Sequence, residues 1–437
     1  MNKLLFFLLF TVAVPLSAQA LTLNLDQCVQ RGLELNPQVQ SYRIGIEEAD
    51  EEVNEAWGAF LPTLSASYTH SRLENNRDTG FDRDYLSQDT DSTQVRLSQP
   101  LFSGMGGIAG LKRARHSKEY RQFELQFMQQ QLVREIRTSF YDVLRARQLV
   151  EKWQESVTRL DSQQEIAKAW VDQELAPQLR LLEVAVELST ARQNLVSVKT
   201  DLIEAEASLE EWLVLQPEEA FDIDGAFDSD ALVACETLDA CLEMALNYYP
   251  TLQMAQLNIE MAHEEARMIR ARNLPKASFD ASWTDFKRDY DSSSDLVNDE
   301  EREYYTLAVN LSFSPFQGGK NIFAYRKQNL RAKRLGHELS TQKNSVAAEV
   351  KMRFQQLEEG EGLLDNALKR VEEATEAYNI TDRSARLGVS SLDDLLTAEI
   401  RLTQAEIGKI NAEHGLQQAQ VLLDFVVGAQ YASVSAN

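Results

Sequence analysis

Apolar residues recur every seven positions in two long stretches of the chain, residues 178–215 and residues 391–427. A heptad repeat of this kind predicts helices that pack in a left-handed coiled coil. Large residues at one core position and small ones at the other let neighbouring helices approach closely. The first stretch has Leu181, Leu188, Leu195, Leu202 and Leu209 at one position and Val184, Ala191, Val198, Ala205 and Trp212 at the other; the second has Leu395, Leu402, Lys409, Leu416 and Leu423, with Ala398, Ala405, Ala412, Ala419 and Val426.

Helix-breaking residues are scarce along the whole chain. It has 9 prolines and 18 glycines, and no proline occurs between residues 178 and 216 or after residue 315. Because proline interrupts helices, long helices are expected. The two longest, each of about 70 residues, would reach on the order of 105 Å, more than a compact globular domain needs. The predicted helices cover residues 26–60, 106–175 and 178–215 in the first half, and residues 238–273, 319–387 and 391–427 in the second.

The chain also repeats itself at an offset of about 213 residues. Residues 25–28 match residues 238–241, Pro37 matches Pro250, and Pro62 matches Pro275. Solenoid repeats have periods of about 20–50 residues, so duplication of one large unit explains the pattern better. We expect a signal peptide over residues 1–20 and a tail over residues 431–437. Between them lie a first repeat over 21–217 and a second repeat over 238–430. Residues 218–237 join the two repeats, and we call them the equatorial linker.

Two segments alternate between apolar and polar residues and predict strand pairs, at about residues 63–102 and about residues 276–315. The alternation is clearest in residues 305–313, where Tyr305, Leu307 and Val309 share one face. A soluble sheet with one buried face produces the same alternation. Aromatic residues near the strand ends favour a membrane sheet, because they form girdles at the interface with water. These residues are Phe102, Trp283, Tyr304 and Phe316.

Four strands per chain are too few to close a barrel, and lipid tolerates only closed barrels. If these strands span a membrane, several chains must share one barrel. Two chains would supply eight strands and three would supply twelve. The loops between the paired strands are rich in Asp and Glu, which is typical of solvated tips and prevents their burial in hydrocarbon.

The N-terminal segment reads as an export signal. Lys3 precedes an apolar run from Leu4 to Leu16, and the small residues Ala18 and Ala20 favour cleavage after Ala20. No other stretch approaches the ~20 apolar residues of a membrane-spanning helix. The chain has 44 Lys and Arg against 68 Asp and Glu, a net charge of −24. The negative electrostatic field of such a chain would repel phosphate groups, which excludes a protein built to bind nucleic acid.

Three cysteines are present, at Cys28, Cys235 and Cys241. In an oxidising compartment Cys235 and Cys241 could form a disulfide and leave Cys28 unpaired. Alternatively, Cys28 and Cys241 are small buried helix residues. Because no histidine lies at ligand spacing from these cysteines, a metal site is not expected.

The sequence contains no arrangement that indicates an enzyme or a cofactor. The segment from Gly104 to Gly110 follows a strand and opens a helix, as a dinucleotide-binding loop does, but its spacing is wrong and no parallel βαβ unit surrounds it. Tight turns explain these glycines better. The five histidines are scattered, without zinc-protease spacing, and each is expected on the surface or on a tunnel wall. They are His70, His116, His263, His337 and His414.

Taken together, these motifs resemble the TolC outer-membrane efflux family over essentially the whole mature chain. The resemblance is carried by Asn36-Pro37 and Tyr249-Pro250, by Leu61-Pro62 and Leu274-Pro275, by residues 99–104, and by residues 387–396 at the second reversal. It implies a mainly α fold with a membrane β-barrel. Three chains would form a twelve-stranded barrel in the outer membrane and a twelve-helix tunnel across the periplasm.

The resemblance also implies a function and partners. The chain would be the exit duct of a tripartite efflux or type I secretion system, exporting small molecules or proteins. It would dock to a periplasmic adaptor and to an inner-membrane pump of RND, ABC or MFS type, which would supply the energy. The alternative is a soluble periplasmic coiled-coil adaptor or scaffold.

In that family, acidic side chains ring the periplasmic entrance of the tunnel. Asp394 matches the first of two aspartates at the second-half tip, and Thr397 replaces the second, for which Asp393 is a partial substitute. Alternatively, both acids are ordinary first-turn residues favoured by the helix dipole. Arg180 at the first-half tip suggests a latch to Asp393 or Asp394, or simply an exposed charge. The expected turns between barrel and tunnel contain Pro62, Pro100, Gly104, Pro275, Pro315 and Gly318.

Overall fold

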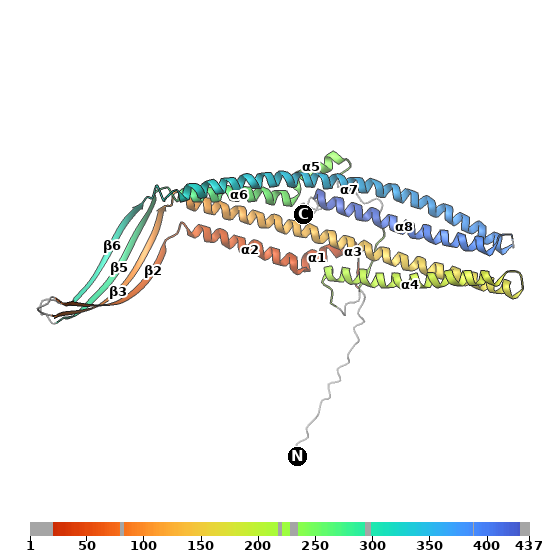
Figure 1. Cartoon of the computed structure of the whole chain (residues 1–437), viewed down its shortest axis with the longest axis horizontal. Helices are drawn as coiled ribbons and strands as arrows, with labels where there is room; N and C mark the ends of the chain where they lie inside the picture. Colours follow the sequence, from red (N-terminus) through yellow and green to blue (C-terminus); the bar gives the residue numbers. More distant parts are fainter. Residues whose placement is uncertain are drawn as a thin grey trace, which may run out of the picture. The chain divides into compact units, whose positions relative to one another are not determined.

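The computed structural model describes residues 21–78, 83–216, 221–227, 235–292, 299–387 and 389–428 (Figure 1). The expected signal peptide at 1–20 and tail at 431–437 lie outside these residues. In chain order the elements are β1 (Leu21–Leu23), α1 (Leu25–Leu35), α2 (Pro37–Gly58), β2 (Thr63–Asp78), β3 (Arg83–Phe102), α3 (Gly106–Asp172), α4 (Gln178–Leu213), β4 (Phe221–Ile223), α5 (Leu238–Tyr248), α6 (Pro250–Ala271), β5 (Lys276–Ser292), β6 (Glu300–Ser312), α7 (Lys320–Arg386) and α8 (Leu392–Val427).

The first helix of each half is broken in two, and here the prediction was wrong. Instead of single helices over 26–60 and 238–273, the chain forms α1 and α2, and α5 and α6. The residue before a proline is driven out of the helical region by the proline ring. Asn36 and Tyr249 accordingly adopt extended ψ angles of 123° and 118°.

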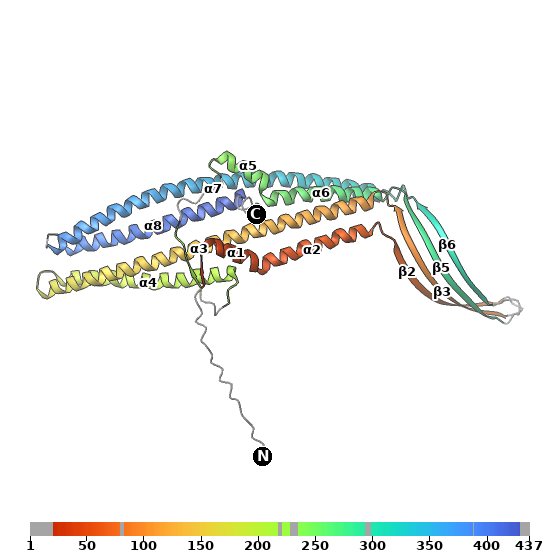
Figure 2. The same ribbon diagram turned by 180° about the vertical axis from the view of Figure 1, so that it is seen from behind.

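The two very long helices and the two returning helices are confirmed. α3 and α7 have 67 residues each, and α4 and α8 have 36 each. Figures 1 and 2, which view the chain from opposite sides, both show α4 alongside the end of α3 and α8 alongside the end of α7. Each long helix therefore reverses into its returning helix.

The predicted heptad seams are largely buried. In α4, Val184, Leu188 and Leu195 are buried, and in α8 all four seam leucines are buried. Lys409 stays half-buried, and the next residue, Ile410, enters the core instead. One cluster joins α3, α4 and α8 through Leu149, Val157, Leu160, Ala167, Val184, Leu188, Ala191, Leu195, Val198, Leu392, Leu396 and Ile410.

The four predicted strands form one antiparallel sheet in the order β2-β3-β5-β6. β3 of the first half pairs with β5 of the second half, so the sheet joins the two repeats. The pairing is continuous except for a register shift between Pro100 and Phe102. Among the described strands, β2 and β6 each have one edge without a partner.

A second, two-stranded parallel sheet pairs β1 with β4 and was not predicted from the sequence. β4 lies within the segment expected as an equatorial linker. Each strand has three residues, too few to show a period of two along the sequence.

Cys235 and Cys241 form a disulfide, with their Cα atoms 5.3 Å apart, so the first alternative holds for this pair. The second holds for Cys28, which is unpaired and buried at the start of the first repeat. Burial raises the pKa of the Cys28 thiol to about 11, so it stays protonated and unreactive at neutral pH.

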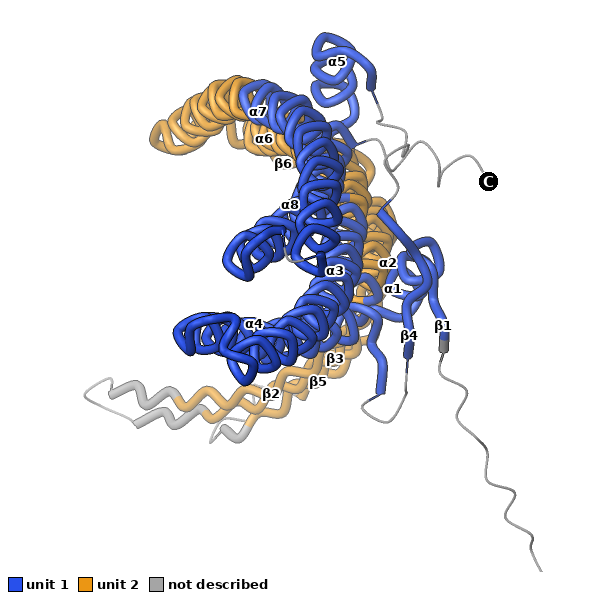
Figure 3. Tube along the Cα trace, turned by 90° about the vertical axis from the view of Figure 1, so that its right-hand side faces the viewer, with its two compact units in different colours: residues 1–40, 127–249, 346–437 blue, residues 41–126, 250–345 orange. Residues whose placement is uncertain are grey.

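The chain divides into two compact units that do not follow the repeats (Figure 3). Unit 1 contains residues 1–40, 127–249 and 346–437, with the helix reversals and the disulfide. Unit 2 contains residues 41–126 and 250–345, with the four-stranded sheet. Within the described ranges, none of the helices combines the length and apolar character needed to cross a membrane.

Gly104 makes the turn from β3 into α3. It has φ +64°, and Met105 after it has φ +68°. A Cβ atom on Gly104 would lie 2.7 Å from the carbonyl oxygen of Ala271 and 2.9 Å from Cβ of Leu274. The glycines here therefore permit a tight turn and a close backbone approach.

We predict that Gly104→Ala destabilises the protein by about 2 kcal/mol or more, because it combines left-handed backbone strain with overpacking. Gly45→Ala is the matched control, since that helical glycine has no atom within 4 Å of an added Cβ. The control should be neutral or stabilising by up to about 1 kcal/mol. Thermal unfolding in detergent measures both, and equal midpoints for the two variants would contradict the prediction.

Candidate functional site

The turn from α7 into α8 places both candidate acids in the first turn of α8. The N-cap residue Ser391 and Asp394 form a capping box. The Asp394 backbone N–H donates to Ser391 Oγ at 3.1 Å, and Ser391 donates to Asp394 Oδ2 from its hydroxyl at 2.6 Å and from its backbone N–H at 3.1 Å. Two orphan helix donors are thereby satisfied.

Asp394 remains exposed despite these bonds. The Ser391 hydroxyl, and then its backbone N–H, hold the pKa of the Asp394 carboxyl below its usual value. Asp394 is therefore ionised at neutral pH. It lines a groove between α7 and α8 together with Thr397 and Arg401.

The turn from α3 into α4 is built without glycine. Glu174 takes the left-handed conformation with φ +58° that glycine usually supplies. The Leu175 N–H donates to the Trp170 carbonyl at 2.8 Å and closes the end of the helix. Pro177 then serves as the N-cap residue of α4, where it needs no N–H donor.

Arg180 links the two turns. Its Nη1 atom donates to Glu183 at 2.7 Å within α4 and to Asp393 of α8 at 3.2 Å. Glu183 first, and then Asp393, raise the pKa of the guanidinium group. Of the two partners considered from the sequence, the structure brings Asp393 to Arg180, whereas Asp394 is bonded to Ser391.

The six expected turn residues lie near the ends of the four strands. Pro62 and Pro275 immediately precede β2 and β5, and Pro315 follows β6. Gly104 and Gly318 have φ values of +64° and +60°. Pro100 differs, because it lies within β3 beside the register shift, where a missing N–H is tolerated.

A buried polar cluster between α3 and α8 was missed by the sequence analysis. Glu399 has no exposed surface. It accepts hydrogen bonds from Arg159 Nε at 2.7 Å, from Ser156 Oγ at 3.1 Å and from Thr403 Oγ1 at 3.0 Å. Arg159 also donates to Glu406 at 3.2 Å, and burial raises the pKa of that carboxyl.

Further polar contacts continue along the same two helices. His414 Nε2 lies 2.6 Å from Asp142, Arg145 donates to Asn411 at 2.9 Å, and Arg137 pairs with Asp424 at 3.1 Å.

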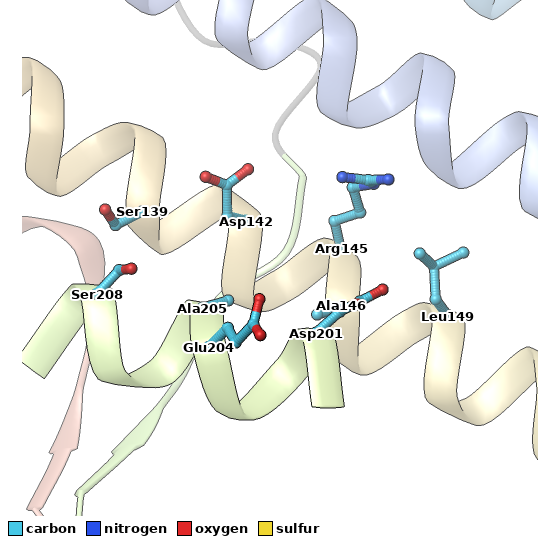
Figure 4. A pocket seen from close by; sticks show the side chains of 9 residues that line it. All are labelled: Ser139, Asp142, Arg145, Ala146, Leu149, Asp201, Glu204, Ala205 and Ser208. Carbon is cyan, nitrogen blue, oxygen red and sulfur yellow. The ribbon is translucent and has the colours of Figure 1, made fainter. Parts of the chain in front are cut away.

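A small groove is lined by residues of α3 and α4 (Figure 4). Asp142 and Arg145 form part of its α3 wall, and their side chains leave α3 on the side away from α4. Asp201, Glu204 and Ser208 line the α4 wall.

His414 corrects the expectation that every histidine is a surface or tunnel-wall residue, because it is 8% exposed and packs between helices. The missed residues of α8 are separated by three, four, six or eight positions and lie between the leucine and alanine positions of the heptad pattern. They are Glu399, Thr403, Glu406, His414, Gln418 and Asp424. A polar stripe on otherwise apolar helices was the available signal.

Comparison with known proteins places the chain in a family. The model of the outer membrane efflux protein family matches residues 28–213 and 241–429, one segment in each repeat, and the chain belongs to this family. Its members are outer-membrane channels and not enzymes. The chain is accordingly an outer-membrane protein whose tunnel extends into the periplasm.

Individual relatives are distant. The outer membrane efflux protein BepC of Brucella suis is 20% identical over 92% of this chain and 85% of its own length. The alkaline protease secretion protein AprF of Pseudomonas aeruginosa is 27% identical, over 24% of this chain and 21% of its own length. The solved structure of the channel CusC matches with a TM-score of 0.80 over 93% of each chain, at 13% identity, and supports the fold alone.

We predict that Glu399→Ala lowers the free energy of unfolding by about 3 kcal/mol, because it leaves the largely buried Arg159 without its closest partner. Asp365→Ala is the control, since the ion pair of Asp365 with Lys369 is exposed on α7. It should cost about 0.5 kcal/mol or less. Unfolding in detergent, followed by circular dichroism, compares the two variants. Equal losses in the free energy of unfolding would contradict the prediction.

Proposed function

We propose that three copies of this chain form a duct from the periplasm through the outer membrane, through which a pump in the inner membrane expels cargo. The observation that carries this proposal is the four-stranded sheet. One of its faces is apolar and exposed, and two of its edges are open. Such a sheet is stable in lipid only when other copies complete it.

Three copies give a twelve-stranded barrel and two give eight. Three are favoured because a homotrimer is the norm in this family. α4 also presents a stripe of exposed apolar side chains that solvent would disfavour, and neighbouring copies would cover it. The stripe consists of Leu179, Leu182, Val186, Val196 and Ile203.

The reversals of unit 1 form the entrance of the duct in this proposal. Three copies of Asp393 and Asp394 would gather negative charge around one axis and favour cations there. The contact between Arg180 and Asp393 would hold the two helical hairpins of one chain together in the closed entrance. Docking of a periplasmic adaptor would break this contact and favour the open state.

The cargo would be small molecules or a secreted protein, and the pump would be of the RND, ABC or MFS type. The names of the relatives support both kinds of cargo, since BepC is an efflux protein and AprF serves protease secretion. A soluble adaptor is disfavoured by the exposed apolar face of the sheet.

The role of the entrance acids is tested by single-channel recording in a planar bilayer. The parent should give small, cation-selective currents that a divalent or trivalent cation blocks. Asp394→Asn should weaken that block, because it removes the charge but keeps an oxygen that can cap the helix. Asp365→Asn is the control: it removes one exposed charge from α7 instead, and it should leave the block unchanged. Block of equal strength in all three proteins would remove Asp394 from the entrance.

The latch is tested by charge reversal. Arg180→Glu would place a third acid beside Glu183 and Asp393, so the closed entrance should loosen and the conductance should rise. Adding Asp393→Arg to this variant restores an opposite pair and should return the conductance toward that of the parent. Glu183→Gln keeps the pair between Arg180 and Asp393 and is the control. Unchanged conductance in Arg180→Glu would exclude the latch.

A further inference from the structure

The strand register divides the described side chains of the sheet into two faces. Directly paired residues point to the same side, so odd-numbered residues of β2 share a face with even-numbered residues of β3, β5 and β6. We call this the polar face. It is mostly Ser, Thr, Gln and Asn, as in Ser65, Ser67, Gln94, Thr306 and Asn310.

The opposite side, the apolar face, carries a continuous band of hydrophobic side chains next to the helix ends of the strands. Leu64 is paired with Leu97, and Ala281 with Leu307. Leu64, Leu307 and Leu311 are 73–74% exposed, far more than a soluble protein would leave on one sheet. Lipid therefore covers the apolar face, and the polar face at the same level is directed to a water-filled lumen.

Charge is separated between these faces against the trend of the whole chain. The net charge of the protein is −24. Yet the described polar face has four basic and two acidic side chains, a net charge of +2, whereas the apolar face has two basic and seven acidic ones, a net charge of −5. The basic residues of the polar face are Lys276, Arg96, Arg288 and Arg302.

Three of the four cations of the polar face, Arg96, Arg288 and Arg302, lie at two levels along the strands. Arg96 is paired with Ser65 and Ser282, level with the hydrophobic band. Farther along the strands, Arg288 lies over the rings of Phe286 at 4.8 Å and Tyr290 at 5.9 Å. These contacts hold the guanidinium group over the polar face.

One acid is shared by two cations at this second level. Glu300 accepts from Arg288 at 3.5 Å and also contacts Arg302. Two arginines against one glutamate leave a net charge of +1 among these three side chains. The acids of the other face, such as Asp89, Asp285 and Glu301, are on the far side of the sheet. Salt further weakens their effect on the polar face.

We propose that the polar face lines the barrel lumen and makes the outer section of the duct favour anionic over cationic cargo, with Arg96, Arg288 and Arg302 as the residues that determine this preference. The inference rests on the proposed function and deepens it by assigning the outer section a charge preference opposite to that of the entrance. Three copies would triple the net positive charge in one narrow lumen. Rings of Arg and Lys select anions in pores by this means.

The test is the zero-current potential of single channels across a KCl gradient. Arg288→Gln with Arg302→Gln removes two charges from the polar face. Arg72→Gln with Lys287→Gln is the matched control, because it removes two charges at similar levels on the opposite face. The first pair should shift the potential toward that of potassium, and the control should not. The shift should shrink between about 0.1 M and about 1 M salt, as the Debye length falls from about 10 Å to about 3 Å.

The entrance acids are the same in all these variants, so the difference between the pairs isolates the sheet. Thr306→Arg adds a cation to the polar face without disturbing an ion pair and should shift the potential in the other direction. Recording in the Arg180→Glu background repeats the comparison with a wider entrance. Two outcomes would overturn the inference. One is an equal shift of the zero-current potential in the two double variants. The other is no shift in any of the variants, Thr306→Arg included. A parent that forms no channel would instead reject the proposed function.

Discussion

In hydrocarbon every backbone N–H and C=O group needs a partner within the protein, and the sheet of this chain leaves two edges open. The duplicated sequence brings two strand pairs together, yet four strands cannot curve into a closed wall. Everything else about the molecule depends on this constraint. In the proposed duct, further copies of the chain would cover the two open edges of the sheet.

The helices satisfy two different demands. The seam of leucine and small residues buries apolar surface and makes the hairpins stable, but it is tolerant of sliding by one heptad. The polar contacts between α3 and α8 are not tolerant, because a shift would separate buried Glu399 from Arg159, its closest partner. Stability therefore comes mainly from the seam, and alignment of the two hairpins comes from the polar stripe.

The function that we propose depends on a few charges that the fold brings together. Arg180 and Asp393 are 213 positions apart in the sequence, and two helix reversals bring them to 3.2 Å. Likewise Arg288 and Lys287 are neighbours in the chain but serve opposite sides of the sheet. An acidic protein can thus have a sheet face with a net positive charge, because strand alternation sorts charge by face and not by position along the chain.

The spacing of apolar residues and the positions of proline in the sequence were enough to predict the duplication, the four long helices of the reversals and the four strands. The helices and strands are local features, since each depends on the spacing of residues within one element. Only the tertiary structure decided what depends on distant partners. It paired β1 with β4, buried His414 and selected Asp393 for Arg180. Each of these outcomes is a contact or a local conformation whose energy is set by surroundings that no single segment of sequence contains.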